Sequence, residues 1–109
     1  MPDKCIVAMV KPDLTDKVVD AAKAVGATGA TIIDAAGTGA REAKTFFGLS
    51  LDVRTEVVLL LVKEDEVAPV LDTIREAGRF HEPGTGIAFV MAVEAAIGFE
   101  SQRRESPPA

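Results

Sequence analysis

The sequence predicts an α+β fold in which two helices cover one face of an antiparallel sheet. Three observations support this prediction. The chain has the length of one domain, its apolar runs and helical patterns follow the order β-α-β-β-α-β, and its two halves share one plan. In each half an apolar strand leads to a helix that ends at glycine, and a loop returns to a second apolar strand. A duplicated βαβ unit of this length is typical of the ferredoxin-like sandwich.

The first half contains two strands and one helix. Residues 4–10 and 30–36 form the apolar runs that predict strands. Asp13 or Thr15 is expected to cap the intervening helix, and Gly26 is expected to end it. The apolar positions of this helix recur at the spacing of one helical face: Leu14, Val18, Ala22 and Val25.

The second half repeats this plan after a polar segment. The segment 40–53 has weak periodicity, and no element is predicted there. Residues 54–63 form the strongest strand, and residues 87–93 form the last one. Asp65 is expected to cap the second helix, and Gly78 is expected to end it. The apolar positions of this helix are Val70, Leu71, Ile74 and Ala77.

Length and charge narrow the functional classes. The 109 residues predict one domain over residues 1–99 and a flexible polar tail over 100–109. With 12 basic and 17 acidic residues, the net charge is −5. The sequence has no stripe of basic residues of the kind that binds nucleic acid, so we expect no nucleic-acid partner. Cys5, the single cysteine, excludes an intrachain disulfide and is expected to be a small buried hydrophobe. No apolar run is long enough to span a membrane and no signal peptide is visible, so we expect a cytoplasmic protein.

The strands are apolar on both faces, which predicts self-association. Two helices cover only one face of a sheet, and the other face would expose a large apolar surface unless further copies of the chain buried it. A monomer with a deep, non-alternating core is the alternative. Two strands show this pattern, because successive side chains of a strand point to opposite faces. In one strand Val57, Leu59 and Leu61 share a face and Val58, Leu60 and Val62 share the other. In the last strand the two sets are Ile87, Phe89, Met91 and Val93, and Ala88, Val90 and Ala92.

Catalysis and metal binding have little support in the sequence. His81 is the single histidine, and no nucleophile–base pair is recognisable, so we predict no enzyme activity. His81 and Glu82 are adjacent in a turn, but two adjacent ligands do not make a metal site.

Two Gly-Thr-Gly triplets are the main candidates for ligand binding. The triplet 37–39 leaves the second strand, and the triplet 84–86 enters the last one. Glycine allows backbone N–H groups to approach an anion closely, although glycine is also ordinary in turns. Neither triplet fits the P-loop or dinucleotide fingerprint. If close approach is the role of Gly86, its replacement by valine should abolish binding and leave the assembly intact.

The polar segment also contains a candidate partner-binding loop. Phe46 and Phe47 lie in it together with Lys44. These phenylalanines form either an exposed patch for a partner protein or a latch that folds the loop onto the core. The residues alone leave both interpretations open.

Six short motifs follow one another in a characteristic order from about Lys4 to Ile97. In that order and spacing they resemble the PII nitrogen-regulatory signal-transduction proteins. The motifs are Lys11-Pro12, Gly26-Ala27-Thr28-Gly29-Ala30-Thr31, Gly37-Thr38-Gly39, Arg54-Thr55-Glu56-Val57-Val58, Gly84-Thr85-Gly86-Ile87-Ala88-Phe89-Val90 and Val93-Glu94-Ala95-Ala96-Ile97.

The resemblance implies a ferredoxin-like homotrimer with adenine-nucleotide sites between subunits. It also implies regulation of a target protein, often a membrane transporter or an enzyme. Glu56 would pack the base and brace the cleft together with Val58. The implied nucleotide-binding residues on one side of the cleft are Thr31, Gly37, Thr38, Gly39 and Val58, and those on the neighbouring subunit are Gly84, Thr85 and Gly86.

This chain also departs from the family pattern. It contains no tyrosine, so the family's modifiable tyrosine is absent from its short loop. Ile87 replaces the phosphate-binding lysine, and Thr85 replaces an acidic residue. Losing one charge-assisted contact removes about 1.5–3 kcal/mol, roughly a tenfold to hundredfold change in affinity. We therefore expect AMP or ADP to bind at least as well as ATP, with charge supplied by Arg41, Lys44, or Arg103 and Arg104.

Alternative functions remain open at this point. A metal-responsive trimer like the CutA family shares the fold but would need more clustered ligands than this sequence has. A small enzyme lacks an acid–base pair, and a structural oligomerisation module would not require the glycine triplets. The residues alone do not identify the effector: an adenine nucleotide is expected, and bicarbonate, 2-oxoglutarate or no effector are the alternatives.

Overall fold

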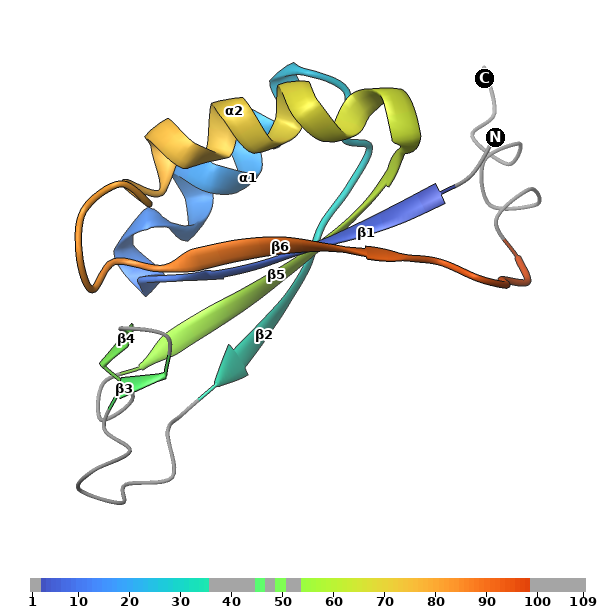
Figure 1. Cartoon of the computed structure of the whole chain (residues 1–109). Coiled ribbons are helices and arrows are strands. Elements are labelled where there is room, and N and C mark those ends of the chain that lie inside the picture. The colour runs from blue at the N-terminus through green and yellow to red at the C-terminus, as the bar shows by residue number, and fades with distance from the viewer. Residues whose placement is uncertain (1–2, 36–44, 47–48, 51–53, 99–109) are drawn as a thin grey trace, which may run out of the picture.

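A four-stranded antiparallel sheet carries two helices on one of its faces (Figure 1). The computed structural model describes residues 3–35, 45–46, 49–50 and 54–98. The strand order β2-β5-β1-β6 places the first strands of the two halves side by side at the centre, as the ferredoxin-like sandwich requires. The predicted fold is confirmed. The strands are β1 (Asp3–Val10), β2 (Thr31–Ala35), β5 (Thr55–Lys63) and β6 (Ile87–Ala92).

Each long helix begins with a short 3₁₀ turn. The turn η1 (Pro12–Leu14) precedes α1 (Thr15–Ala24), and η3 (Glu64–Glu66) precedes α2 (Val67–Ala77). In the part of the chain that the structure describes, neither helix has the length and apolar character needed to cross a membrane.

The predicted N-terminal caps are wrong. The residue before α1 is Leu14, and neither Asp13 nor Thr15 caps the helix with its side chain. Proline fixes its own φ near the helical value, so the chain already turns at Pro12, and the Leu14 N–H donates to the Lys11 carbonyl at 2.8 Å. Asp65 lies inside η3.

The predicted helix ends are confirmed. After α1 the chain reaches Gly26, whose φ of 126° is a backbone conformation that residues other than glycine rarely adopt. Gly78 directly follows α2, and its N–H donates to the Ile74 carbonyl at 2.8 Å.

A small hairpin was not predicted. Strands β3 (Thr45–Phe46) and β4 (Leu49–Ser50) pair antiparallel, with Thr45 opposite Ser50 and Phe46 opposite Leu49. This hairpin lies beyond the ends of β2 and β5 (Figure 1). Strands of only two residues are too short to show a detectable periodicity in the sequence.

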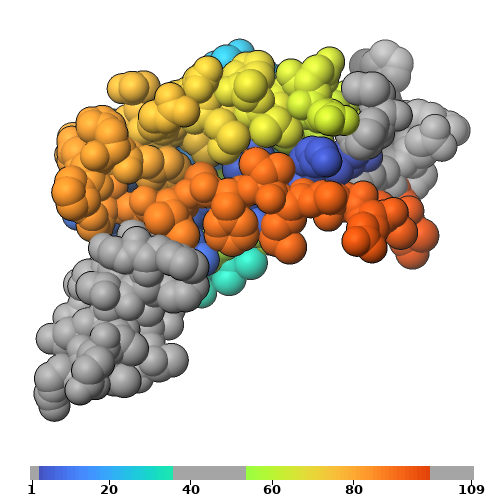
Figure 2. Space-filling view, in the orientation of Figure 1, coloured from blue at the N-terminus to red at the C-terminus, as the bar shows by residue number. Residues whose placement is uncertain are grey.

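The core lies between the helices and the covered face of the sheet. In the space-filling view α2 lies directly above β6 and the loop that precedes it (Figure 2). Complete burial of such aliphatic side chains contributes about 1.5–3 kcal/mol each. The core residues with no more than 3% exposure are Ile6, Ala8, Val10, Val18, Ala22, Val58, Leu60, Val62, Val70 and Ile74.

The opposite face of the sheet carries no helix and is also apolar. Because directly paired residues share a face, the register defines this helix-free face. Its exposure rises from 9% at central Val7 to 40% at Phe89 and 53% at Met91. The expected two-sided apolar sheet is confirmed. Polar residues lie at its ends, with Asp3 opposite Lys63 and Thr55 opposite Ala35. The other residues of the helix-free face are Cys5, Val7, Met9, Thr31, Ile33, Val57, Leu59, Leu61, Ile87, Phe89 and Met91.

Candidate functional site

A pocket of about 380 Å³ lies where the chain enters β2. Thr31, one of the predicted site residues, lies in its wall. The wall combines aliphatic side chains with two threonines, which suits a flat ring with polar edges. Its lining residues are Cys5, Thr28, Gly29, Ala30, Thr31, Leu59 and Leu61.

The triplet 84–86 lies at the other edge of the sheet, just before β6. Thr85 is 6% exposed, and its hydroxyl lies 2.5 Å from the Arg79 carbonyl and 2.9 Å from the Glu82 carbonyl. These contacts hold together the loop in which Arg79 adopts a positive φ of 57°. Thr85 therefore organises the turn, and its own N–H donates to the Glu82 carbonyl at 3.4 Å.

The role expected for Gly86 needs correction. A Cβ atom at this position would lie 2.2 Å from the Met9 carbonyl oxygen and 2.7 Å from Cε1 of Phe80. The absence of a side chain is thus required for packing β6 against β1. A valine here would disturb the fold, so the expectation that it would leave the assembly intact is wrong.

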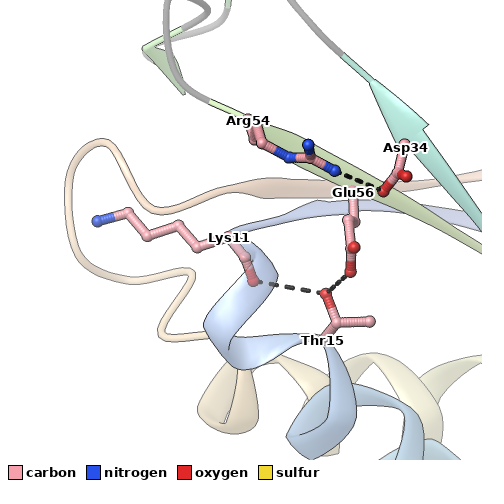
Figure 3. Close-up of polar contacts among 5 residues, drawn as sticks. All are labelled: Lys11, Thr15, Asp34, Arg54 and Glu56. Carbon is pink, nitrogen blue, oxygen red and sulfur yellow. Dashed lines mark hydrogen bonds and ion pairs between the residues drawn. The ribbon is translucent and has the colours of Figure 1, made fainter.

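A polar network lies at the end of the sheet near the hairpin (Figure 3). The Thr15 hydroxyl donates to Oε1 of Glu56 at 2.5 Å, and the Lys11 carbonyl lies 3.5 Å from the same hydroxyl. The Arg54 guanidinium pairs with the Asp34 carboxylate at 3.3 Å. The network connects the first residue of α1 to β5, and β5 to β2.

A comparison with protein families decides the identity of this fold. The family model described as nitrogen regulatory protein P-II matches residues 3–103. The chain belongs to the P-II family. This family consists of signal-transduction regulators.

Two curated P-II relatives match nearly the whole chain. A nitrogen regulatory protein P-II of Rhodospirillum rubrum is 32% identical over 106 residues, which are 93% of this chain and 95% of the relative. A nitrogen fixation nifHD region GlnB-like protein 1 of Methanobacterium ivanovii is 31% identical over 94 residues, 85% and 90% of the two chains.

Solved P-II structures share the fold. Arabidopsis thaliana PII bound to citrate superposes with a TM-score of 0.71 at 29% identity, covering 92% of this chain and 85% of the other. A putative PII-like signaling protein of Thermus thermophilus gives a TM-score of 0.64 at 25% identity, covering 85% and 88%.

Within this P-II chain the predicted nucleotide residues are widely separated. Thr31 begins β2 at one edge of the sheet, whereas the triplet 84–86 precedes β6 at the other edge. Val58 has 0% exposure, so in this conformation its side chain packs in the core and offers no surface to a ligand. Glu56 is partly buried and hydrogen-bonded to Thr15.

Several predicted residues cannot be placed. Phe46 belongs to β3 by its backbone. The others lie outside the described residues: Gly37, Thr38, Gly39, Arg41, Lys44 and Phe47, together with residues 99–109.

Part of the pocket wall was not predicted from the sequence. Leu59 and Leu61 reach the pocket because the register places them beside Thr31 and Cys5. Cys5 is half-buried in the pocket wall and not in the core, and burial raises the pKa of its thiol. Among the described residues no three His, Cys, Asp or Glu side chains gather in a metal-binding cluster.

Proposed function

We propose that this P-II protein is a cytoplasmic homotrimeric regulator that binds an adenine nucleotide in clefts between subunits. Binding would control contact with a target protein such as a membrane transporter or an enzyme. The protein itself would have no catalytic role. The single observation that carries the proposal is the placement of the two candidate half-sites on opposite edges of one sheet.

Within one chain these half-sites lie too far apart to form a cleft. Thr31 of the pocket lies on β2 at one edge of the sheet, and the triplet 84–86 precedes β6 at the other edge. Leu59 and Leu61 of β5 and Cys5 of β1 complete the pocket wall. From Thr31 to the β6 edge, three inter-strand spacings span roughly 14 Å. A neighbouring copy would bring its β6 edge to the β2 edge of this chain, and one ligand would then contact both half-sites.

The helix-free face supplies a reason for the copies to assemble. Phe89 is 40% and Met91 53% exposed in the single chain, and neither lines the pocket. An apolar face of this kind is rare on a monomer, and each Å² buried contributes roughly 25 cal/mol. Packing three such faces together would bury the side chains outside the pocket wall and would align the sheet edges in pairs.

The chemistry of the half-sites fits a nucleotide. The pocket beside Thr31 suits an adenine ring, and the threonine hydroxyls can hydrogen-bond to its edge. The backbone N–H groups of the flanking glycines Gly84 and Gly86 would be the donors to a phosphate. Ile87 follows the turn without a charge, so we expect AMP or ADP to bind at least as tightly as ATP.

Isothermal titration of the purified protein with AMP, ADP and ATP tests this proposal. We expect heat with ADP and an affinity for ATP that is no higher. Tight ATP binding with negligible ADP binding would contradict the preference for short phosphates. The absence of heat with all three would contradict nucleotide binding itself.

A further inference from the structure

The ion pair between Arg54 and Asp34 joins the two strand ends that flank residues 36–53. Asp34 is the penultimate residue of β2, and Arg54 directly precedes β5. Their nitrogen and oxygen atoms are 3.3 Å apart, and the side chains are 71% and 69% exposed (Figure 3). The pair is thus open to solvent and to a ligand.

The neighbouring carboxylate explains why Asp34 takes this partner. Asp34 lies directly opposite Glu56 in the β2–β5 ladder, and like charges in directly opposed positions repel each other. Thr15, 3% exposed, holds Glu56 through its hydroxyl, so Glu56 is fixed. Arg54 offsets the repulsion by attracting the Asp34 carboxylate.

The exposed Arg54–Asp34 ion pair can exchange partners more easily than the hydrogen bond between Thr15 and Glu56. Ion pairs as exposed as this one contribute little, because water and salt screen them and two long side chains must be ordered. A planar guanidinium also matches the geometry of phosphate as well as that of carboxylate. An incoming phosphate can therefore replace Asp34 at Arg54 without unfolding any element.

The position of Arg54 fits a phosphate along the proposed cleft. The pocket beside Thr31 lies at one end of β2, and Arg54 lies at the other. Arg54 is also at the end of the sheet where Gly86 contacts Met9. The pocket wall belongs to the helix-free face, whereas Asp34, the partner of Arg54, lies on the helix-covered face. A nucleotide with its base in the pocket would therefore pass around the β2 edge and extend its phosphates toward Arg54 and the glycine turn of the neighbouring copy.

We propose that Arg54 is a phosphate-binding residue of the nucleotide site and that Asp34 is its internal competitor. The inference rests on the proposed nucleotide binding and adds the source of positive charge that Ile87 lacks. In the free protein Asp34 occupies Arg54. In the complex the phosphate takes its place.

Replacing Arg54 and replacing Asp34 should change the ADP affinity in opposite directions. Arg54→Gln removes the phosphate contact, and we expect affinity to fall about tenfold or more. Asp34→Asn removes the competitor, and we expect affinity to rise by up to about fivefold. A purely structural ion pair would make both variants change affinity in the same direction.

Titration calorimetry with ADP and with adenosine measures these effects. Arg54→Gln should leave adenosine affinity unchanged because adenosine carries no phosphate, and Arg54→Lys should recover part of the ADP affinity. The pair Arg75–Asp72 on α2 is a matched control with the same 3.3 Å separation and 55% and 70% exposure. Its variants Arg75→Gln and Asp72→Asn should bind ADP like the wild type.

Thermal unfolding of each variant verifies the fold. If Arg54→Gln binds ADP as tightly as the wild type, or if Arg54→Gln and Asp34→Asn change the ADP affinity in the same direction, the role of Arg54 is overturned. Nucleotide binding itself would still stand. A wild-type protein that gives no heat with ADP would overturn both proposals.

Discussion

Replacement of Gly86 by alanine should destabilise the fold before it affects any ligand. The added Cβ would lie 2.2 Å from the Met9 carbonyl oxygen, and Cβ atoms essentially never approach other heavy atoms closer than 3.0 Å. Strand β6 or β1 would have to shift, because the obstacle is a backbone atom and not the end of a flexible side chain. Phe80, at 2.7 Å, would also have to move.

The cost follows from the nature of the obstacle. Overpacking by one methyl group costs typically about 1–3 kcal/mol. Because a backbone carbonyl in the sheet cannot rotate away, we expect the upper part of this range, roughly 2–3 kcal/mol. For a domain of this size each kcal/mol shifts the Tm by about 4 °C, so we expect a fall of roughly 8–12 °C.

Thermal unfolding followed by circular dichroism measures this fall. Gly29→Ala is the matched control, because a Cβ there meets nothing within 4 Å and needs no unusual φ. It should keep the wild-type Tm or raise it slightly, since alanine restricts the unfolded chain. A Gly86→Ala protein that melts within about 2 °C of the wild type would refute the packing role of Gly86.

Three further predictions concern single side chains. Thr15→Val should lower the free energy of unfolding by about 1–3 kcal/mol, because the Glu56 carboxylate loses its donor, while Thr15→Ser should keep most of the stability in urea titrations; equal loss in both variants would count against the hydrogen bond. Leu60→Asp should prevent folding, because it puts an unpaired charge at a position with 0% exposure, and a cooperative native-like melt would contradict this. Cys5 should react with iodoacetamide more slowly at pH 8 in the folded protein than in urea, because burial raises the pKa of the thiol and lowers the fraction of reactive thiolate; equal rates would disprove the effect.

The sequence predicted the features that depend on local pattern. Apolar runs and helical spacing identified every strand of the main sheet and both long helices, and Gly26 and Gly78 identified the helix ends. The two-sided apolar pattern of residues 57–62 correctly indicated a helix-free face that remains apolar. These signals lie within one segment of the chain and need no knowledge of its neighbours.

The remaining features depend on contacts between distant residues. Thr15 was expected to cap a helix, but its hydroxyl contacts Glu56, 41 residues away. Gly86 has the local context of a ligand-binding glycine, but the sheet register places the Met9 carbonyl against it. Leu59 joins the pocket beside Thr31 only because of the β2–β5 register. No local pattern contains these pairings.

The most direct test of the central claim, that the nucleotide site forms between copies of the chain, combines light scattering with ADP titration. We expect a mass of about 34 kDa, three times the 11.4 kDa chain, and one ADP per chain. Phe89→Asp, on the helix-free face at 40% exposure, should give a folded monomer that no longer binds ADP. A folded monomer that binds ADP as tightly as the wild-type protein would contradict the claim.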